Sequence, residues 1–311
     1  MLDCYDVMEV VLEYTNFKDL WSLAQTDKAL QLMIRRFFRT RVDRQIAMFL
    51  KPKSPPVEQL ETLLYKFWER ITLSHSAVHG SLLLYMERCV RAAKPWVPGN
   101  LNIAVPFGAV RPWIRYFSDE SAGTLKYREV EVDSFVLWHI ASRWELEIIP
   151  GKFIIITETR GPCVAEAVIV SPHTANMQLL TRDFLIMYYP QKAFDESALD
   201  SWHYPTIPAS QDLDRRGVRK SIDNSSWVTQ CGWACPILWR RVSKDRGTLI
   251  FRVGDDTAVL DRTITCSHLK WRLGDTCYNS ECKNYATHYY PYIPGYFSAL
   301  GAELRSTLRD Q

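Results

Sequence analysis

The stretch from Ile71 to Phe107 constrains the fold most strongly, because it predicts a strand, a tight turn, a helix and a second strand in close succession. An extended segment running to about Val78 is followed by Gly80-Ser81, where glycine permits a turn that bulkier residues resist. Apolar residues at helical spacing then predict a helix that ends before Pro95. Leu101 to Val105 predicts the second strand. We expect the rest of the chain to be arranged around this unit.

Composition limits the classes of protein to which the chain can belong. Its 311 residues, 47% hydrophobic and 23% charged, are typical of a folded soluble protein. The net charge of +3 is too small to indicate a nucleic-acid or acidic-membrane partner. Asp3 and Asp6 replace the basic start of a secretory signal, and the eight scattered cysteines favour reduced thiols. We therefore expect an intracellular protein, cytoplasmic or nuclear, with no membrane partner.

The clearest cluster of structure-breaking residues runs from Lys51 to Pro56 and predicts a domain boundary. Residues 1–50, before it, predict helices with one apolar face each. Residues 57–200 predict a mixture of helices and strands, and residues 201–311 predict a turn-rich extension packed on them. The chain is thus expected to have an α+β fold.

Several further elements follow from local patterns. Two strand predictions are an apolar strand from Val164 to Val170 and another from Thr248 to Val253. Residues 148–157 predict a hairpin that turns at Gly151 and ends in a buried strand. Two helices are predicted, one after Pro172 and one at the end of the chain over residues 296–308. The inward residues of the first are Met177, Leu180, Phe184 and Leu185.

The unit around Gly80-Ser81 resembles the start of a nucleotidyltransferase-fold domain of the polymerase-beta-like superfamily. In that superfamily a Gly-Ser pair lies at a strand-to-helix turn, and the following strand carries Asp-x-Asp. The resemblance places Asn100 and Asn102 at the two acid positions of this chain. It also implies that residues 57–200 form a mixed sheet flanked by helices.

The two asparagines change the chemistry that the resemblance implies. The acids of the superfamily hold divalent metal against a nucleotide triphosphate, whereas asparagine offers one neutral oxygen. Glu166, on the expected strand, is a candidate for a third acid, with Glu158 as its rival, yet neither replaces the missing pair. We expect a vestigial site without catalysis or cofactor, and Mg²⁺ with a nucleotide triphosphate is the alternative. Its residues are Gly80, Ser81, Asn100, Asn102 and Glu166.

Residues 1–50 resemble an F-box, although its usual Leu-Pro opening is replaced by Tyr5-Asp6. The resemblance implies docking to the Skp-type adaptor of a cullin ubiquitin ligase. The alternative is that these helices only cover the next domain. The matching residues are Asp6-Val7, Val11-Leu12, Asp19-Leu20, Leu23-Ala24, Thr26 and Leu30.

Motifs in the same order resemble a set of uncharacterised basidiomycete proteins, which has no established activity. That set carries an F-box-like start, a Gly-Ser turn and an Asp-Leu-Asp-Ile-Tyr-Val-Pro strand, where this chain has Asn-Leu-Asn-Ile-Ala-Val-Pro at 100–106. Its later His-Ser-Thr-x-x-Met-Asn block corresponds to His173-Thr174 and Asn176-Met177. Its Ser-Cys-Pro-x-x-x-Arg segment corresponds to residues 231–241.

Two clusters leave alternatives open. Five arginines between Arg35 and Arg44 indicate either a phosphate-binding surface or, as we expect, the solvated face of an amphipathic helix. Cys231, Cys235, Cys277 and Cys282 are able to supply four thiolates to zinc, with Cys266 and His268 nearby in sequence. Because neither pair has the Cys-x-x-Cys spacing, we expect buried free cysteines and keep zinc as the alternative.

Three functional hypotheses follow. The first is a catalytically inactive nucleotidyltransferase-like protein that serves as a binding or adaptor module. The second is an active metal-dependent nucleotidyltransferase with displaced acids. The third is an F-box substrate receptor of a cullin ubiquitin ligase. The seven histidines are dispersed and no signature of nucleophilic catalysis accompanies them.

Overall fold

In the computed structural model, strand β2 (Asn100–Val105) lies near the middle of an eight-stranded mixed sheet with the order β11-β7-β6-β1-β2-β5-β4-β3. The other strands of this sheet are β1 (Ala77–His79), β3 (Lys126–Glu129), β4 (Ile140–Ile149), β5 (Lys152–Thr159), β6 (Gln178–Leu180), β7 (Phe184–Met187) and β11 (Leu249–Arg252). The structure describes residues 4–50, 57–87, 96–120, 125–132, 139–200, 213–242, 245–254, 257–260, 269–287 and 296–297.

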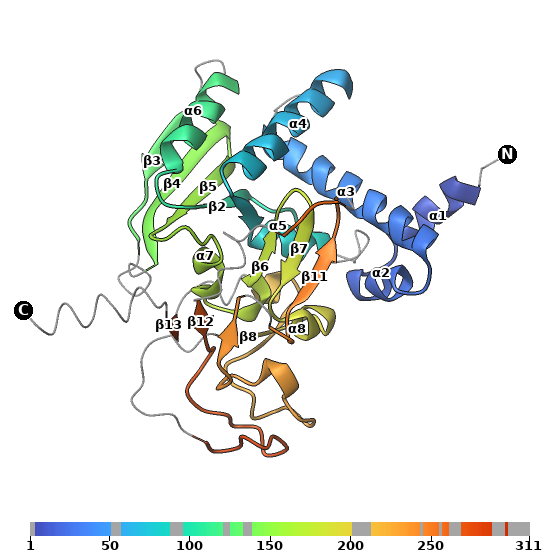
Figure 1. The fold of residues 1–311 in the computed structure, drawn as a ribbon, viewed down its shortest axis with the longest axis vertical. Helices are drawn as coiled ribbons and strands as arrows, with labels where there is room; N and C mark the ends of the chain where they lie inside the picture. Colours follow the sequence, from blue (N-terminus) through green and yellow to red (C-terminus); the bar gives the residue numbers. More distant parts are fainter. Residues whose placement is uncertain are drawn as a thin grey trace, which may run out of the picture.

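Helices surround this sheet (Figure 1). They are α1 (Cys4–Glu13), α2 (Phe17–Ala24), α3 (Lys28–Leu50), α4 (Val57–Leu73), α5 (Ser81–Glu87), α6 (Val110–Glu120), α7 (Glu166–Ile169) and α8 (Pro190–Phe194). Smaller elements are β8 (Ser197–Leu199), β9 (Arg219–Ser221), β10 (Arg240–Arg241), β12 (Lys270–Trp271), β13 (Tyr296–Phe297) and the 3₁₀ turns η1 (Thr174–Asn176) and η2 (Gly232–Ala234). The mixed α+β fold expected from the sequence is thereby confirmed.

Both faces of β2 are covered, and alternate residues of the strand enter different cores. Leu101, Ile103 and Val105 join the apolar side chains of helices α2 to α6 in the larger core. Ala104 belongs instead to the core formed with α7 and β12. Asn100 and Asn102 share the face of Ala104, because side chains alternate along a strand. The two asparagines therefore lie on the side of the sheet away from the long helices.

The N-terminal helices pack on the sheet through aromatic side chains. Phe251, on the edge strand β11, contacts the rings of Phe17, Trp21 and Phe38 with centroid distances of 5.8, 5.6 and 6.0 Å. All three contacts are edge-to-face, the arrangement that aromatic quadrupoles favour. The N-terminal helices and a strand from the last third of the chain thus share one core.

The arginine cluster of α3 is only partly the solvated face that the sequence predicts. Arg36 and Arg44 are exposed, but Arg41 is buried. The guanidinium of Arg39 lies 4.1 Å from the ring centroid of Trp68 on α4, and its Nε donates to Asp43 Oδ2 at 3.0 Å. Because Trp68 Nε1 also donates to Asp43, at 2.7 Å, part of the cluster joins α3 to α4.

The predicted helix after Gly80 is confirmed, as are the strand at 101–105, the hairpin at 148–157 and the strand near 250. Two predictions are wrong. The expected strand from Val164 to Val170 contains helix α7, and the expected helix after Pro172 is the hairpin β6–β7. In the last predicted helix, Tyr296–Phe297 forms β13, and residues 298–308 lie outside the described residues. Among the described helices, none has both the length and the apolar character that crossing a bilayer requires.

Candidate functional site

The Gly-Ser site, formed by Gly80, Ser81, Asn100 and Asn102, is assembled by the unit β1–turn–α5–β2. Gly80 has a φ of +80°, a left-handed conformation that L side chains rarely adopt. A Cβ atom at position 80 would lie only 2.8 Å from Asn102 Nδ2. The turn therefore requires glycine twice, once for its backbone angle and once for the close approach of Asn102.

Ser81 begins helix α5 and connects it to the start of β2. Its hydroxyl donates to Asn100 Oδ1 at 3.2 Å, and Ser81 and Asn102 are 6% and 8% exposed. The pair His79–Asn102 in the β1–β2 register places His79 on the same face as Asn102. The structure thus brings together all four residues of the Gly-Ser site, and adds His79, which the sequence did not single out.

The electrostatic surroundings of the Gly-Ser site do not favour a cation. Burial, and then the positive charge of Arg143, lower the pKa of His79 to about 3, so this histidine is neutral at physiological pH. Its Nε2 is buried and has no hydrogen-bond partner in the described part of the chain. Two neutral amides, a neutral imidazole and a nearby guanidinium supply no negative charge to hold Mg²⁺.

Strand β5 runs parallel to β2 and offers no acid on the face of the asparagines. Asn100 pairs with Phe153, Asn102 with Ile155 and Ala104 with Thr157. Glu158 pairs with Val105, so it lies on the opposite face. There its carboxylate accepts hydrogen bonds from Gly108 N at 2.8 Å and Ser142 Oγ at 2.7 Å. Glu158 is thereby used to hold the loop after β2.

Glu166 lies apart from the Gly-Ser site. It is on α7, where a Cβ atom at Gly161 would lie 2.6 Å from its Oε1, and its Oε2 is 3.4 Å from His139 Nδ1. Gly161 follows the end of β5, whereas Asn100 pairs with a residue at the beginning of β5. Glu166 and the asparagines are therefore at opposite ends of the strand.

The surroundings of Glu166 keep it protonated to an unusually high pH. Burial raises its pKa to about 7, and burial with the charge of Arg160 lowers the pKa of His139 to about 3. The two side chains are consequently both neutral between these values. Glu166 is therefore a buried acid that packs beside Gly161 and His139 and has a structural role.

The cysteine cluster, formed by Cys231, Cys235, Cys277 and Cys282, is brought together although its two pairs are far apart in sequence. All four side chains are buried, and their Sγ atoms lie within 4.8 Å of one another. Burial raises the pKa of Cys231 to about 11, and it also raises the pKa of Cys235. Cys266 and His268, the other two candidates from the sequence, lie outside the described residues.

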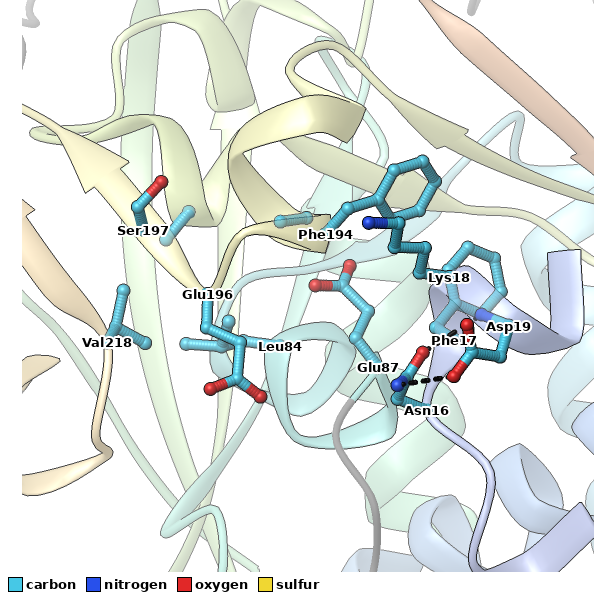
Figure 2. Close-up of a pocket in the computed structure, with 12 residues that line it drawn as sticks. Asn16, Phe17, Lys18, Asp19, Leu84, Glu87, Phe194, Glu196, Ser197 and Val218 are labelled. Atoms are coloured by element: carbon cyan, nitrogen blue, oxygen red, sulfur yellow. Dashed lines mark hydrogen bonds between the residues drawn. The ribbon is translucent and has the colours of Figure 1, made fainter. Parts of the chain in front are cut away.

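A separate hollow of about 290 Å³ lies between the start of α2 and the second half of α5. Figure 2 shows the Glu87 carboxylate near its centre, with Lys18 and Phe194 beside it and Asn16 hydrogen-bonded to Asp19. Its lining includes none of the residues of the Gly-Ser site and none of the cysteine cluster. The sequence gives no signal for this hollow, because its lining comes from five separate parts of the chain.

Comparison of the chain with protein-family models, with curated proteins and with solved structures found no match in any of the three.

The close approach at Gly80 gives a direct test of the turn. Gly80→Ala and Gly151→Ala both place a side chain at a similar left-handed φ, +80° and +76°, which costs about 1–2 kcal/mol. Only at position 80 does the new methyl group meet another side chain, since nothing lies within 4 Å of a Cβ at Gly151. We expect Gly80→Ala to lower the free energy of unfolding by about 1 kcal/mol or more beyond Gly151→Ala, measured by urea denaturation. Equal losses in the two variants would show that Asn102 does not pack on the turn.

The raised pKa of Glu166 predicts a pH-dependent stability. Between pH 4.5, its ordinary pKa, and about pH 7, the unfolded chain loses this proton while the folded protein keeps it. Stability from this group is therefore highest below pH 4.5 and decreases as the pH rises to about 7. The side chain of the Glu166→Gln variant cannot ionise. The difference in unfolding free energy between this variant and the wild type should therefore shift in favour of the variant by a few kcal/mol as the pH rises through this window, and should stay constant above it. Chemical denaturation at closely spaced pH values measures the difference, and a constant difference contradicts the prediction.

Proposed function

We propose that this protein is a catalytically inactive nucleotidyltransferase-like protein that serves as a binding or adaptor module. The observation that carries the proposal is the close approach of Asn102 to Gly80 and the hydrogen bond between Asn100 and Ser81. By the sequence resemblance, these two amides take the positions of the superfamily's metal-binding acids. The topology supports it, because β1 and β2 are antiparallel and joined by the glycine turn and α5, and β5 is parallel to β2.

The charge balance of the Gly-Ser site favours binding without metal over catalysis. Mg²⁺ in phosphoryl-transfer sites is held by carboxylates and substrate phosphates, and it gives up its hydration water reluctantly. Ile155 occupies the β5 position directly beside Asn102, where a carboxylate would complete such a site. A ligand of this site would instead meet amide groups, the buried Nε2 of His79 and the positive potential of Arg143.

The alternative of an active enzyme with displaced acids receives less support. Such an enzyme needs at least one acid close to the nucleotide that the turn would bind. Glu166 lies at the far end of β5 beside His139, and Glu158 lies on the other face of the sheet. Neither carboxylate is adjacent to the Gly-Ser site.

Nucleotide binding and transfer assays test the proposed function. We expect no Mg²⁺-dependent incorporation of any nucleotide into added acceptors, and no change in thermal stability when Mg²⁺ and a nucleotide triphosphate are added together. A ligand at a hundred times its dissociation constant would add about 2.7 kcal/mol, which a melting experiment detects easily. Incorporation that disappears in Glu158→Gln or Glu166→Gln would overturn the proposal.

The double variant Asn100→Asp, Asn102→Asp tests whether the scaffold is that of a lost metal site. Restoring two carboxylates should destabilise the metal-free protein by charge repulsion, and millimolar Mg²⁺ should reverse part of that loss. Gln25→Glu, which adds an acid at an exposed position elsewhere, is the control and should show no such Mg²⁺ effect. A double variant that is equally indifferent to Mg²⁺ argues against a nucleotidyltransferase-like site.

A second candidate function is docking to a Skp-type adaptor, and it is favoured by the outer surface of α1. Val7, Val10, Val11 and Tyr14 are between 45% and 55% exposed there, and clustered exposed apolar side chains mark interaction surfaces. Leu20, by contrast, is 1% exposed and belongs to the protein's core. The adaptor would therefore contact α1, while Leu20 stabilises the fold.

A pull-down with the purified adaptor distinguishes this candidate from the alternative, in which the N-terminal helices only cover the sheet. Val10→Asp places a charge in the exposed apolar row and should abolish capture of the adaptor. Val228→Asp, at a position 86% exposed and distant in sequence, is the matched control and should bind as the wild type does. Binding that is absent in the wild type, or unchanged in Val10→Asp, removes the F-box interpretation.

A further inference from the structure

The cysteine cluster has the dimensions of a single-ion site. Cys231 Sγ lies 3.8 Å from Cys277 Sγ, and Cys235 Sγ lies 3.8 Å from Cys282 Sγ. Four sulfurs placed about 2.3 Å from a tetrahedral zinc ion are about 3.8 Å from one another. We propose that Cys231, Cys235, Cys277 and Cys282 bind one structural Zn²⁺ ion as a tetrathiolate.

The same distances argue against other states of four cysteines. A disulfide brings two sulfurs to about 2.05 Å, far closer than either pair in the cluster. An iron–sulfur cluster places its inorganic core between the cysteines and so needs some of the sulfurs farther apart than the 4.8 Å limit observed here. A single tetrahedral ion fits the space.

Amide groups directed at the sulfurs support thiolates. Asn224 Nδ2 donates to Cys231 Sγ at 3.2 Å and to Cys277 Sγ at 3.1 Å. Its Oδ1 accepts from Tyr278 N at 2.9 Å, which fixes the orientation of the amide so that the NH₂ group faces the sulfurs. Buried thiols that serve only as small apolar groups do not need such donors.

A second amide is fixed in the same way. Asn279 Nδ2 donates to Cys231 Sγ at 3.2 Å and to Thr229 O at 2.7 Å, while its Oδ1 accepts from Glu281 N at 2.9 Å. The asparagines at 224 and 279 are both fully buried. Hydrogen bonds of this kind offset the negative charge that four thiolates carry around a divalent ion.

A third amide reaches another sulfur of the cluster. Asn284 Nδ2 donates to Cys235 Sγ at 3.5 Å. Together with Asn224 and Asn279, amide donors therefore reach the sulfurs of Cys231, Cys235 and Cys277.

The surrounding segment explains why an ion would be useful there. Apart from Ile237, the buried residues of its apolar cluster are the four cysteines themselves. Within residues 222–239 and 272–287, which carry the cysteines, the 3₁₀ turn η2 is the only described element, and a region with so small a cluster of its own is often stabilised by a structural metal. All four ligands come from the protein, which leaves no open position for a substrate and indicates a structural ion.

Metal analysis of the full-length protein tests the proposal. Protein purified under reducing conditions, without added metal, should contain one zinc ion per chain by inductively coupled plasma mass spectrometry. In competition with a chelator, the Cys277→Ala variant should bind zinc at least about tenfold more weakly than the wild type does. Cys163→Ala changes another fully buried cysteine, outside the cluster, and as the matched control should keep its zinc.

Two readouts keep the result decisive if Cys277→Ala does not fold. Wild-type protein reconstituted with Co²⁺ should show the visible absorption of tetrahedral cobalt with thiolate charge-transfer bands. Removing zinc from the wild type with a chelator should lower its melting temperature, and added Zn²⁺ should restore it. Wild-type protein that is folded yet takes up no zinc, that contains iron in its place, or that carries a disulfide within the cluster would overturn the proposal.

Discussion

The pairing of β2 with both β1 and β5 is the constraint on which the rest of the structure depends. Parallel strands require a long crossover, and the chain between β2 and β5 accordingly contains α6, β3 and β4. Burial of β2 on both faces then demands one layer of helices on one side and a second core on the other. Asn100 and Asn102 occupy the beginning of this strand, so they meet the glycine turn that precedes α5.

The elements that the sequence predicts well have local signals. Helices α2 and α4 each have one apolar face and one polar face, which the spacing of their residues predicts. The β4–β5 hairpin turns at Gly151, which has a positive φ. The sequence predicts a strand where α7 lies, because apart from Glu166 the segment is apolar and a short buried run has no distinguishing period. The sequence predicts a helix in place of the β6–β7 hairpin for the same reason. The turn of this hairpin depends on the Thr181 hydroxyl, which accepts a hydrogen bond from Phe184 N.

The candidate sites differ in the same way. Gly80, Ser81, Asn100 and Asn102 belong to consecutive elements, so their proximity is predictable from sequence order. The cysteine pairs are joined by tertiary folding of irregular loops, and their spacing alone argued for ordinary buried thiols. The asparagines at 224, 279 and 284 are a further indication of a metal site, but only the three-dimensional structure shows that their amides donate to the sulfurs. Glu166 lies away from the asparagines because its segment forms helix α7 and not the predicted strand.

The position of Phe251 has a consequence for the order in which the protein matures. Ribosomes deliver the chain from its amino end, so helices α2 and α3 leave the exit tunnel long before residue 251 is made. Until then the rings of Phe17, Trp21 and Phe38 lack the contact with Phe251 that they make in the finished sheet. The nascent chain therefore exposes an apolar helical surface during most of its synthesis, and chaperones bind surfaces of this kind.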